Sequence, residues 1–202
     1  CIRDRHKEIY EQRTILQDMT SRFVGKNKIL PNIFGHNTDK LLENIEHIHF
    51  VACGTSYHAS LVAKDWIEQF TKITCTAEVA SEYKYKKINV LPKTLFVSIS
   101  QSGETADTIS SLKKALKLSY TNTLAICNVA ESTLTRLSGM NFLMNAGPEI
   151  SVASTKAFTS QLFTLLLLTV ILSRKYGKTE KKMVQDIRPV SYTHLTLPTS
   201  VI

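Results

Sequence analysis

Hydroxyl and amide side chains gather where a buried strand is expected to turn into a helix. Thr94–Val97 is apolar and partly β-branched, which predicts a strand, and the spacing of Ile109, Leu112 and Leu116 predicts one face of a helix. The run Ser-Gln-Ser-Gly-Glu-Thr, residues 100–105, lies between them. A helix start offers backbone N–H donors and the positive end of a dipole, so this run suits a phosphate group. A plain helix cap is the competing interpretation.

A second hydroxyl-rich turn follows an earlier predicted strand, Ile48–Cys53. It begins a predicted helix whose apolar residues share one face: Ala59, Val62, Ala63 and Trp66. In open α/β sheets, ligands bind at the carboxyl ends of strands, where the strand order reverses. Two such turns in one alternation of strands and helices therefore indicate a single anion site between neighbouring strands.

Three stretches carry a resemblance to the sugar isomerase (SIS) domain family: Cys53–Ser56, Ser100–Asp107 and Ser151–Thr159. More narrowly, the chain resembles the isomerase half of the glutamine–fructose-6-phosphate aminotransferases. Lys7–Gln12 is similar to the segment that joins the glutaminase half of those enzymes to their isomerase half, and the resemblance extends over residues 7–188.

The resemblance implies where substrate would bind. The expected contacts lie in a phosphate-binding turn (Ser100, Gln101, Ser102, Thr105), in a first loop that contacts the sugar phosphate (Gly54, Thr55, Ser56), and in a loop that touches the sugar (Val152, Ser154). The family's catalytic Glu, ring-opening His and Lys would lie in a second SIS domain and a C-terminal tail. No catalytic residue, metal ligand or cofactor is therefore expected in this chain, which should bind substrate without converting it.

Other polar side chains have simpler interpretations. Glu104 is expected in the first turn of a helix, where a carboxylate complements the dipole. Lys156 suits either an anion or solvent, and the sequence leaves both open. His47, His49 and His58 have no carboxylate or cysteine at ligand spacing, so we expect ordinary surface or strand residues.

Composition excludes several classes of protein. The chain has 202 residues, enough for one domain with flanking segments, and 43% of them are hydrophobic. A net charge of +8 suits a dianionic sugar phosphate, while the scattered Lys and Arg argue against a nucleic-acid partner. The four cysteines show no metal-ligand spacing and indicate a reducing compartment, hence the cytoplasm. The most apolar run, residues 162–172, is too short to cross a bilayer, so no membrane partner is expected.

Predicted strands and helices alternate with short connections, which indicates a parallel sheet covered on both faces. The resemblance implies five strands in the flavodoxin-like order 2-1-3-4-5, with the first and third strands adjacent. We expect a helical joining segment at 1–46, an SIS domain at 47–188 and a non-native tail at 189–202, where the sequence changes character. The apolar helix predicted over 151–176 would need cover from a second SIS domain or a partner chain.

The resemblance implies part of an enzyme that makes glucosamine 6-phosphate from fructose 6-phosphate and glutamine. Its partners would be a glutaminase domain and a second SIS domain, and the complete enzyme would form a homo-oligomer. One alternative is another SIS sugar-phosphate isomerase or deglycase, against which Lys7–Gln12 argues. The other is a non-catalytic SIS sensor module of a transcription regulator, for which residues 1–46 look too loop-rich to form the DNA-binding domain.

Overall fold

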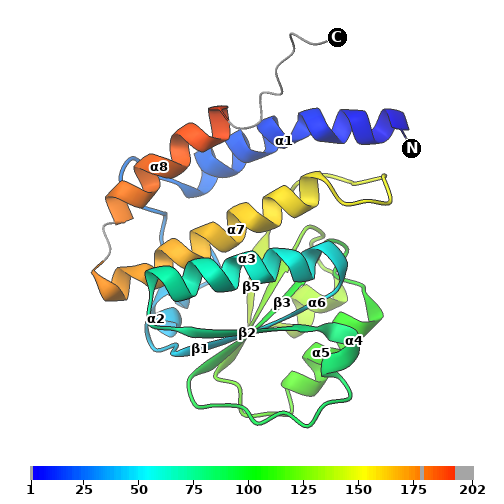
Figure 1. Cartoon of the computed structure of the whole chain (residues 1–202), viewed down its shortest axis with the longest axis vertical. Coiled ribbons are helices and arrows are strands. Elements are labelled where there is room, and N and C mark those ends of the chain that lie inside the picture. Colours follow the sequence, from blue (N-terminus) through cyan, green and yellow to red (C-terminus); the bar gives the residue numbers. More distant parts are fainter. Residues whose placement is uncertain (1, 178–179, 194–202) are drawn as a thin grey trace.

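Five parallel strands form the central sheet in this computed structural model, which describes residues 2–177 and 180–193 (Figure 1). They are β1 (His47–Ala52), β2 (Thr74–Val79), β3 (Thr94–Ser100), β4 (Asn122–Cys127) and β5 (Met140–Leu143). Their order, β2-β1-β3-β4-β5, confirms the predicted flavodoxin-like arrangement. Every residue of β3 is buried, as expected for an interior strand of a parallel sheet with both faces covered.

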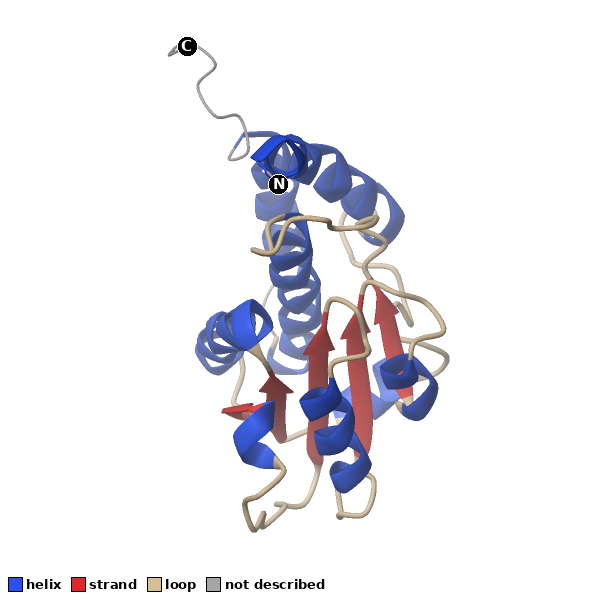
Figure 2. Cartoon of the chain, turned by 90° about the vertical axis from the view of Figure 1, so that its right-hand side faces the viewer, coloured by secondary structure: helices blue, strands red, loops and turns tan. Residues whose placement is uncertain are grey.

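Helices cover both faces of the sheet (Figure 2). One face carries α1 (Ile2–Phe23), α2 (Thr38–Glu43), α3 (Gly54–Phe70), α7 (Lys156–Ser173) and α8 (Glu180–Thr193). The other carries α4 (Ala80–Tyr83), α5 (Ala106–Ala115) and α6 (Thr133–Leu137). Strand side chains alternate between these two layers, so Phe50 joins the larger hydrophobic cluster and Val51 the smaller one.

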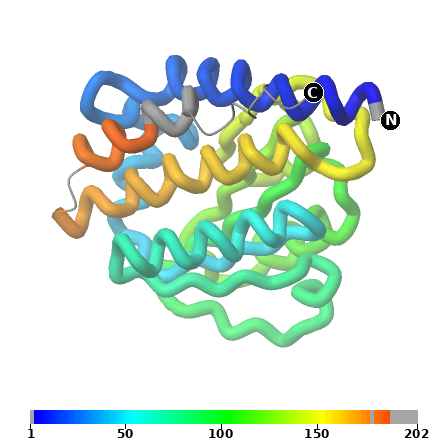
Figure 3. Tube along the Cα trace, turned by 45° about the horizontal axis from the view of Figure 1, so that its top comes forward, coloured from blue at the N-terminus to red at the C-terminus, as the bar shows by residue number. Residues whose placement is uncertain are grey.

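The apolar helix α7 begins later than predicted and is covered differently. Residues 151–155 form a loop, and the helix starts at Lys156 rather than at Ser151. A 3₁₀ turn, Arg174–Tyr176, extends it, and Gly177 ends it at a φ of 67°. The prediction that α7 needs a second domain or chain to cover it is wrong. Helices α1, α3 and α8 of the same chain pack on it, and Figure 3 shows α1, α7 and α3 side by side.

The stretch Lys156–Tyr176 has the length and apolarity of a membrane span, yet 78% of its apolar 18-residue window is buried inside the domain. We therefore assign it as a core helix of the sheet's covering layer.

Helix α8 crosses the boundary predicted at residue 188, because it continues to Thr193. Its Val184 and Ile187 are buried against the larger cluster, and both precede that boundary. The rest of the predicted tail, residues 194–202, lies outside the described residues, so the tail remains a prediction.

Candidate functional site

The turns after β1 and β3 leave the same edge of the sheet. The two strands pair directly in parallel, with Ala52 opposite Ile99, and both point toward one end of the domain (Figure 2). The segments Cys53–Ser56 and Ser100–Thr105 follow them at the place where the strand order reverses. The structure therefore brings together the two hydroxyl-rich turns on which the predicted anion site depends.

The hydroxyls of the β3 turn bind the turn itself. Ser100 Oγ accepts the Gly103 N–H at 3.0 Å and lies 3.2 Å from Thr105 Oγ1. Ser102 Oγ accepts the Glu104 N–H at 3.2 Å. Thr105 is the N-cap of α5, but its side chain makes no capping hydrogen bond. A plain helix cap therefore does not explain these side chains, in contrast to Ser132, whose hydroxyl caps α6.

Gly103 and Glu104 attach this turn to the start of α6. Gly103 has a φ of +67°, and a Cβ there would overlap Ser132 Oγ and lie 2.7 Å from Cys127 Sγ. Glu104 precedes α5 instead of lying in its first turn, so that prediction is wrong. Its carboxylate accepts the Thr133 N–H at 2.6 Å, and this hydrogen bond lowers the pKa of Glu104.

The β1 turn exposes one hydroxyl and buries the other. Gly54 opens α3 with a φ of 57°, and Thr55 is exposed. Ser56 is only 7% exposed and accepts a hydrogen bond from Gln161 Nε2 on α7 at 2.9 Å. Ser56 thus braces α3 against α7, while Thr55 faces the surface.

Val152 and Ser154 lie on a separate segment, residues 144–155, which runs from the end of β5 to the start of α7. Val152 is 98% exposed, and Ser154 Oγ donates to Glu149 Oε2 at 3.0 Å. Glu149 also accepts the Thr155 N–H at 2.7 Å, so its carboxylate caps α7. Among the described residues, no hydrogen bond joins Val152 or Ser154 to the two hydroxyl-rich turns.

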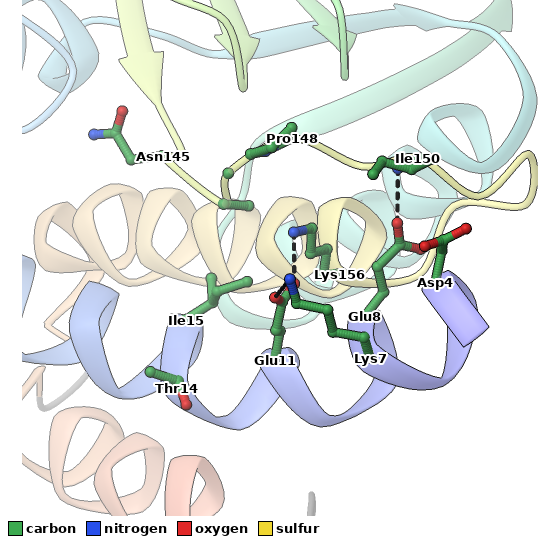
Figure 4. A pocket seen from close by; sticks show the side chains of 12 residues that line it. Asp4, Lys7, Glu8, Glu11, Thr14, Ile15, Asn145, Pro148, Ile150 and Lys156 are labelled. Carbon is green, nitrogen blue, oxygen red and sulfur yellow. Dashed lines mark hydrogen bonds and ion pairs between the residues drawn. The ribbon is translucent and has the colours of Figure 1, made fainter. Parts of the chain in front are cut away.

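A buried carboxylate of helix α1, that of Glu8, binds this segment (Figure 4). Glu8 is 3% exposed, and its Oε1 accepts the N–H groups of Ile150 at 2.7 Å and Ser151 at 3.1 Å. Ser151 Oγ donates to the other carboxylate oxygen. Burial raises the pKa of Glu8, but the hydrogen bonds from Ser151 and Ile150 outweigh it, and the pKa lies below its ordinary value.

Of the two roles that its sequence left open, an anion or solvent, Lys156 meets an anion, and that anion is a carboxylate of this chain. It is 4% exposed, and its Nζ lies 2.7 Å from Glu11 Oε2 on α1. A cavity of about 450 Å³ is lined by α1 and by residues 145–150, with Glu8, Glu11 and Lys156 in its wall (Figure 4).

Four positioning side chains are absent from the sequence-based prediction of the site: Glu8, Glu11, Asn128 and Glu149. Asn128, just after β4, accepts the Ala146 N–H at 2.7 Å and donates to the Gly147 carbonyl at 2.8 Å. One signal was available, because Glu8 and Glu11 stand three residues apart on a predicted helix and share a face.

His49 is packed in the smaller layer, away from the turns. Its Nδ1 lies 2.8 Å from the Tyr120 hydroxyl, and its Nε2 lies 3.4 Å from Glu78 Oε1. Spacing along the sequence indicates no carboxylate near this histidine, but β2 places Glu78 beside it. Burial lowers the pKa of His49. In the described part of the chain, no group of three or more His, Cys, Asp or Glu side chains is placed to hold a metal ion.

Comparisons with known proteins agree with this geometry. The SIS domain family matches residues 41–171. Glutamine–fructose-6-phosphate aminotransferase (isomerizing) of Pseudomonas putida is 48% identical over 186 residues, and that of Pseudomonas aeruginosa is 47% identical. Each match covers 90% of this chain and 30% of the relative.

Two solved structures share the fold to different degrees. The C-terminal domain of glucosamine-fructose-6-phosphate aminotransferase from Francisella tularensis has a TM-score of 0.87 and 41% identity, over 92% of this chain and 53% of that one. The Vibrio vulnificus NanR protein complexed with ManNAc-6P has a TM-score of 0.63 and 18% identity, over 93% and 69% of the two chains, which shows only a common fold. The chain belongs to the SIS domain family and is similar to part of the isomerase half of the glutamine–fructose-6-phosphate aminotransferases.

Proposed function

We propose that this chain binds fructose 6-phosphate at the paired turns after β1 and β3. One observation carries the proposal: two neighbouring helix starts, α3 and α5, share one edge of the sheet, and neither has a side-chain cap. First-turn N–H groups and nearby neutral hydroxyls are the donors that a phosphate dianion accepts from.

The exposed and half-buried side chains are assigned to the phosphate. Thr55, Ser102, Thr105 and Gln101 reach the surface of the two turns, so their polar groups are placed for direct contact. At Gly54 no atom of the part of the chain that the structure describes lies within 4 Å of the point that a Cβ would occupy, which leaves room for close approach to the backbone.

Two of the remaining candidates are assigned to holding the turns in shape, and the other two to contact with the sugar. Ser100 and Ser56 are buried and hydrogen-bonded, so they hold the two turns in place. Val152 and Ser154 are assigned to the sugar end of the substrate, where the exposed Val152 would offer backbone groups and an apolar contact.

The larger context follows from the relatives, of which this chain spans 30% of the length. We assign the chain to a cytoplasmic enzyme that makes glucosamine 6-phosphate from fructose 6-phosphate and glutamine, without metal or organic cofactor. A glutaminase domain and a second SIS domain would be its partners, in a homo-oligomer. This chain alone would bind substrate without converting it.

Calorimetry with fructose 6-phosphate and free fructose tests the proposal. A hydrogen bond to a charged group contributes about 1.5–3 kcal/mol, so Ser102→Ala should weaken fructose 6-phosphate binding about ten- to a hundredfold. Ser110→Ala removes an exposed hydroxyl from α5 and should leave the affinity unchanged. Equal affinity for the sugar and the sugar phosphate would overturn the assignment.

A further inference from the structure

Helix α1 lies outside the residues that match the SIS domain family, yet it holds a segment inside them. The match begins at residue 41, whereas α1 ends at Phe23. Its contacts reach residues 150–159, at the end of the sheet where substrate is proposed to bind. The helix therefore contacts the site from outside the residues that match the family.

Three side chains of one face of α1 make these contacts. Glu8 accepts from Ile150 and Ser151, Glu11 pairs with Lys156, and Gln12 Oε1 accepts from the Thr159 hydroxyl at 2.5 Å. The partners lie on both sides of Val152 and Ser154, so α1 fixes the two ends of the loop that carries them.

Within the loop, Glu149 holds only the later part, through Ser154 Oγ at 3.0 Å and the Thr155 N–H at 2.7 Å. The hydroxyls of Ser151 and Thr155 reach the Ala153 carbonyl only at 3.5 Å and 3.3 Å. The two consecutive N–H groups at 150 and 151 both end on one oxygen of Glu8. Loss of that oxygen would leave two backbone donors without an acceptor and free the loop to adopt other conformations.

We propose that Glu8 is a positioning residue for substrate: from α1 it holds the loop of Val152 and Ser154 where the sugar end of a sugar phosphate binds. The proposal rests on the proposed function, because the loop matters only if substrate binds there. The phosphate end is held by the turn after β3, which α1 does not contact through any of these three side chains. A substitution of Glu8 should therefore weaken binding of the sugar end of the substrate and leave binding of the phosphate unchanged.

The full chain is titrated with fructose 6-phosphate and, separately, with inorganic phosphate, and amide hydrogen exchange is followed at Ile150 and Ser151. Glu8→Ala should accelerate hydrogen exchange at both amides and weaken fructose 6-phosphate binding about tenfold. Its affinity for phosphate should stay within about twofold of the wild type. Glu8→Gln keeps an oxygen for the two N–H groups and should restore most of the affinity. Asp18→Asn makes the same chemical change at an exposed position of α1 and should match the wild type.

Each contrary result has a distinct meaning. Faster exchange with unchanged fructose 6-phosphate affinity would overturn the positioning role and leave the proposed function intact. Equal weakening of both ligands would show that Glu8 only stabilises the fold. If Glu8→Ala shows no cooperative melting, Glu8→Gln is compared with the wild type instead. It should exchange the amides of Ile150 and Ser151 faster and lose a small part of its affinity for fructose 6-phosphate, with no loss of affinity for phosphate. A wild-type chain that binds no fructose 6-phosphate would overturn the proposed function and the positioning role together.

Discussion

At position 103 the turn after β3 has no space for a side chain. Gly103 has a φ of +67°, and its missing Cβ would overlap Ser132 at the start of α6. A left-handed conformation costs a non-glycine residue about 1–2 kcal/mol, and overpacking adds about 1–3 kcal/mol. We expect Gly103→Ala to lower the free energy of unfolding by about 2–5 kcal/mol, measured by urea denaturation.

Gly177→Ala is the matched control for that substitution. Gly177 has the same φ of +67°, but no atom of the described residues lies within 4 Å of the added Cβ. It should therefore lose only the conformational part, about 1–2 kcal/mol. Equal losses at the two positions would show that the contact with Ser132 is unimportant.

Residue types predicted the two hydroxyl-rich turns that the fold brings to one edge of the sheet, but not what each side chain contacts. Ser56 and Lys156 look like candidates for an anion, yet Ser56 meets Gln161 and Lys156 meets Glu11. Those partners are separated by 105 and 145 residues in the sequence, and no local pattern reports such a contact.

At the scale of the elements, a partly exposed ion pair between Glu11 and the buried Lys156 joins α1 to α7. The hydrogen bond and the charge of Lys156 lower the pKa of Glu11 below its ordinary value of 4.5. A lowered carboxyl pKa stabilises the fold above the unfolded value, and this contribution disappears as the pH falls through the folded value. The wild type should therefore lose stability between pH 7 and about pH 3.5, in part through this pair.

Lys156→Met removes the partner of Glu11 and should therefore reduce the loss of stability between the two pH values. The reduction should be only about 1 kcal/mol, because Glu11 is about one-third exposed and solvent screens the pair. The control is Lys7→Met, since Lys7 lies 3.6 Å from the same carboxylate but is 76% exposed. Urea unfolding of the three proteins at both pH values measures the effect. An identical pH dependence in the wild type and Lys156→Met would contradict it.

The elements themselves were largely predictable. The apolar runs 48–53 and 94–97 indicate β1 and β3 within a few residues, and two hydroxyl-rich turns agree with a sheet that reverses between these strands. The start of α7 was not predictable from its hydroxyls, because the carboxylate of Glu149 caps it from outside the helix. Its cover was not predictable either, because α1 resembles a connection between domains and nevertheless packs as part of the core.

At the scale of the whole molecule, the acid–base groups beside the proposed binding edge decide whether this chain could convert its substrate. Conversion of a ketose phosphate requires ring opening and a proton transfer by positioned groups. Among the described residues, the Glu104 carboxylate beside the β3 turn accepts the Thr133 N–H. His49 lies away from the turns, next to Tyr120 in the layer of the smaller hydrophobic cluster. We expect this chain to form neither glucose 6-phosphate nor glucosamine 6-phosphate from fructose 6-phosphate, with or without ammonium.

The assay uses the purified chain beside the full-length Pseudomonas putida relative as the positive control. Calorimetry on the same preparation shows whether substrate is bound. Product that forms in proportion to the concentration of this chain, and disappears in Ser102→Ala, would contradict the prediction and require a base within the described residues.

The position of α7 in the chain has a consequence for synthesis on the ribosome. All five strands lie within residues 47–143, whereas the helix that covers their larger face spans Lys156–Ser173. At a synthesis rate of about 5–20 residues per second, α7 is made several seconds after β1. During that interval Phe50, Leu95 and Ile126 lack part of their final cover, and an incomplete apolar face invites aggregation or chaperone binding. The domain can therefore complete its core only after its most apolar helix has left the ribosome, so a pause in translation before Lys156 would prolong its most vulnerable state.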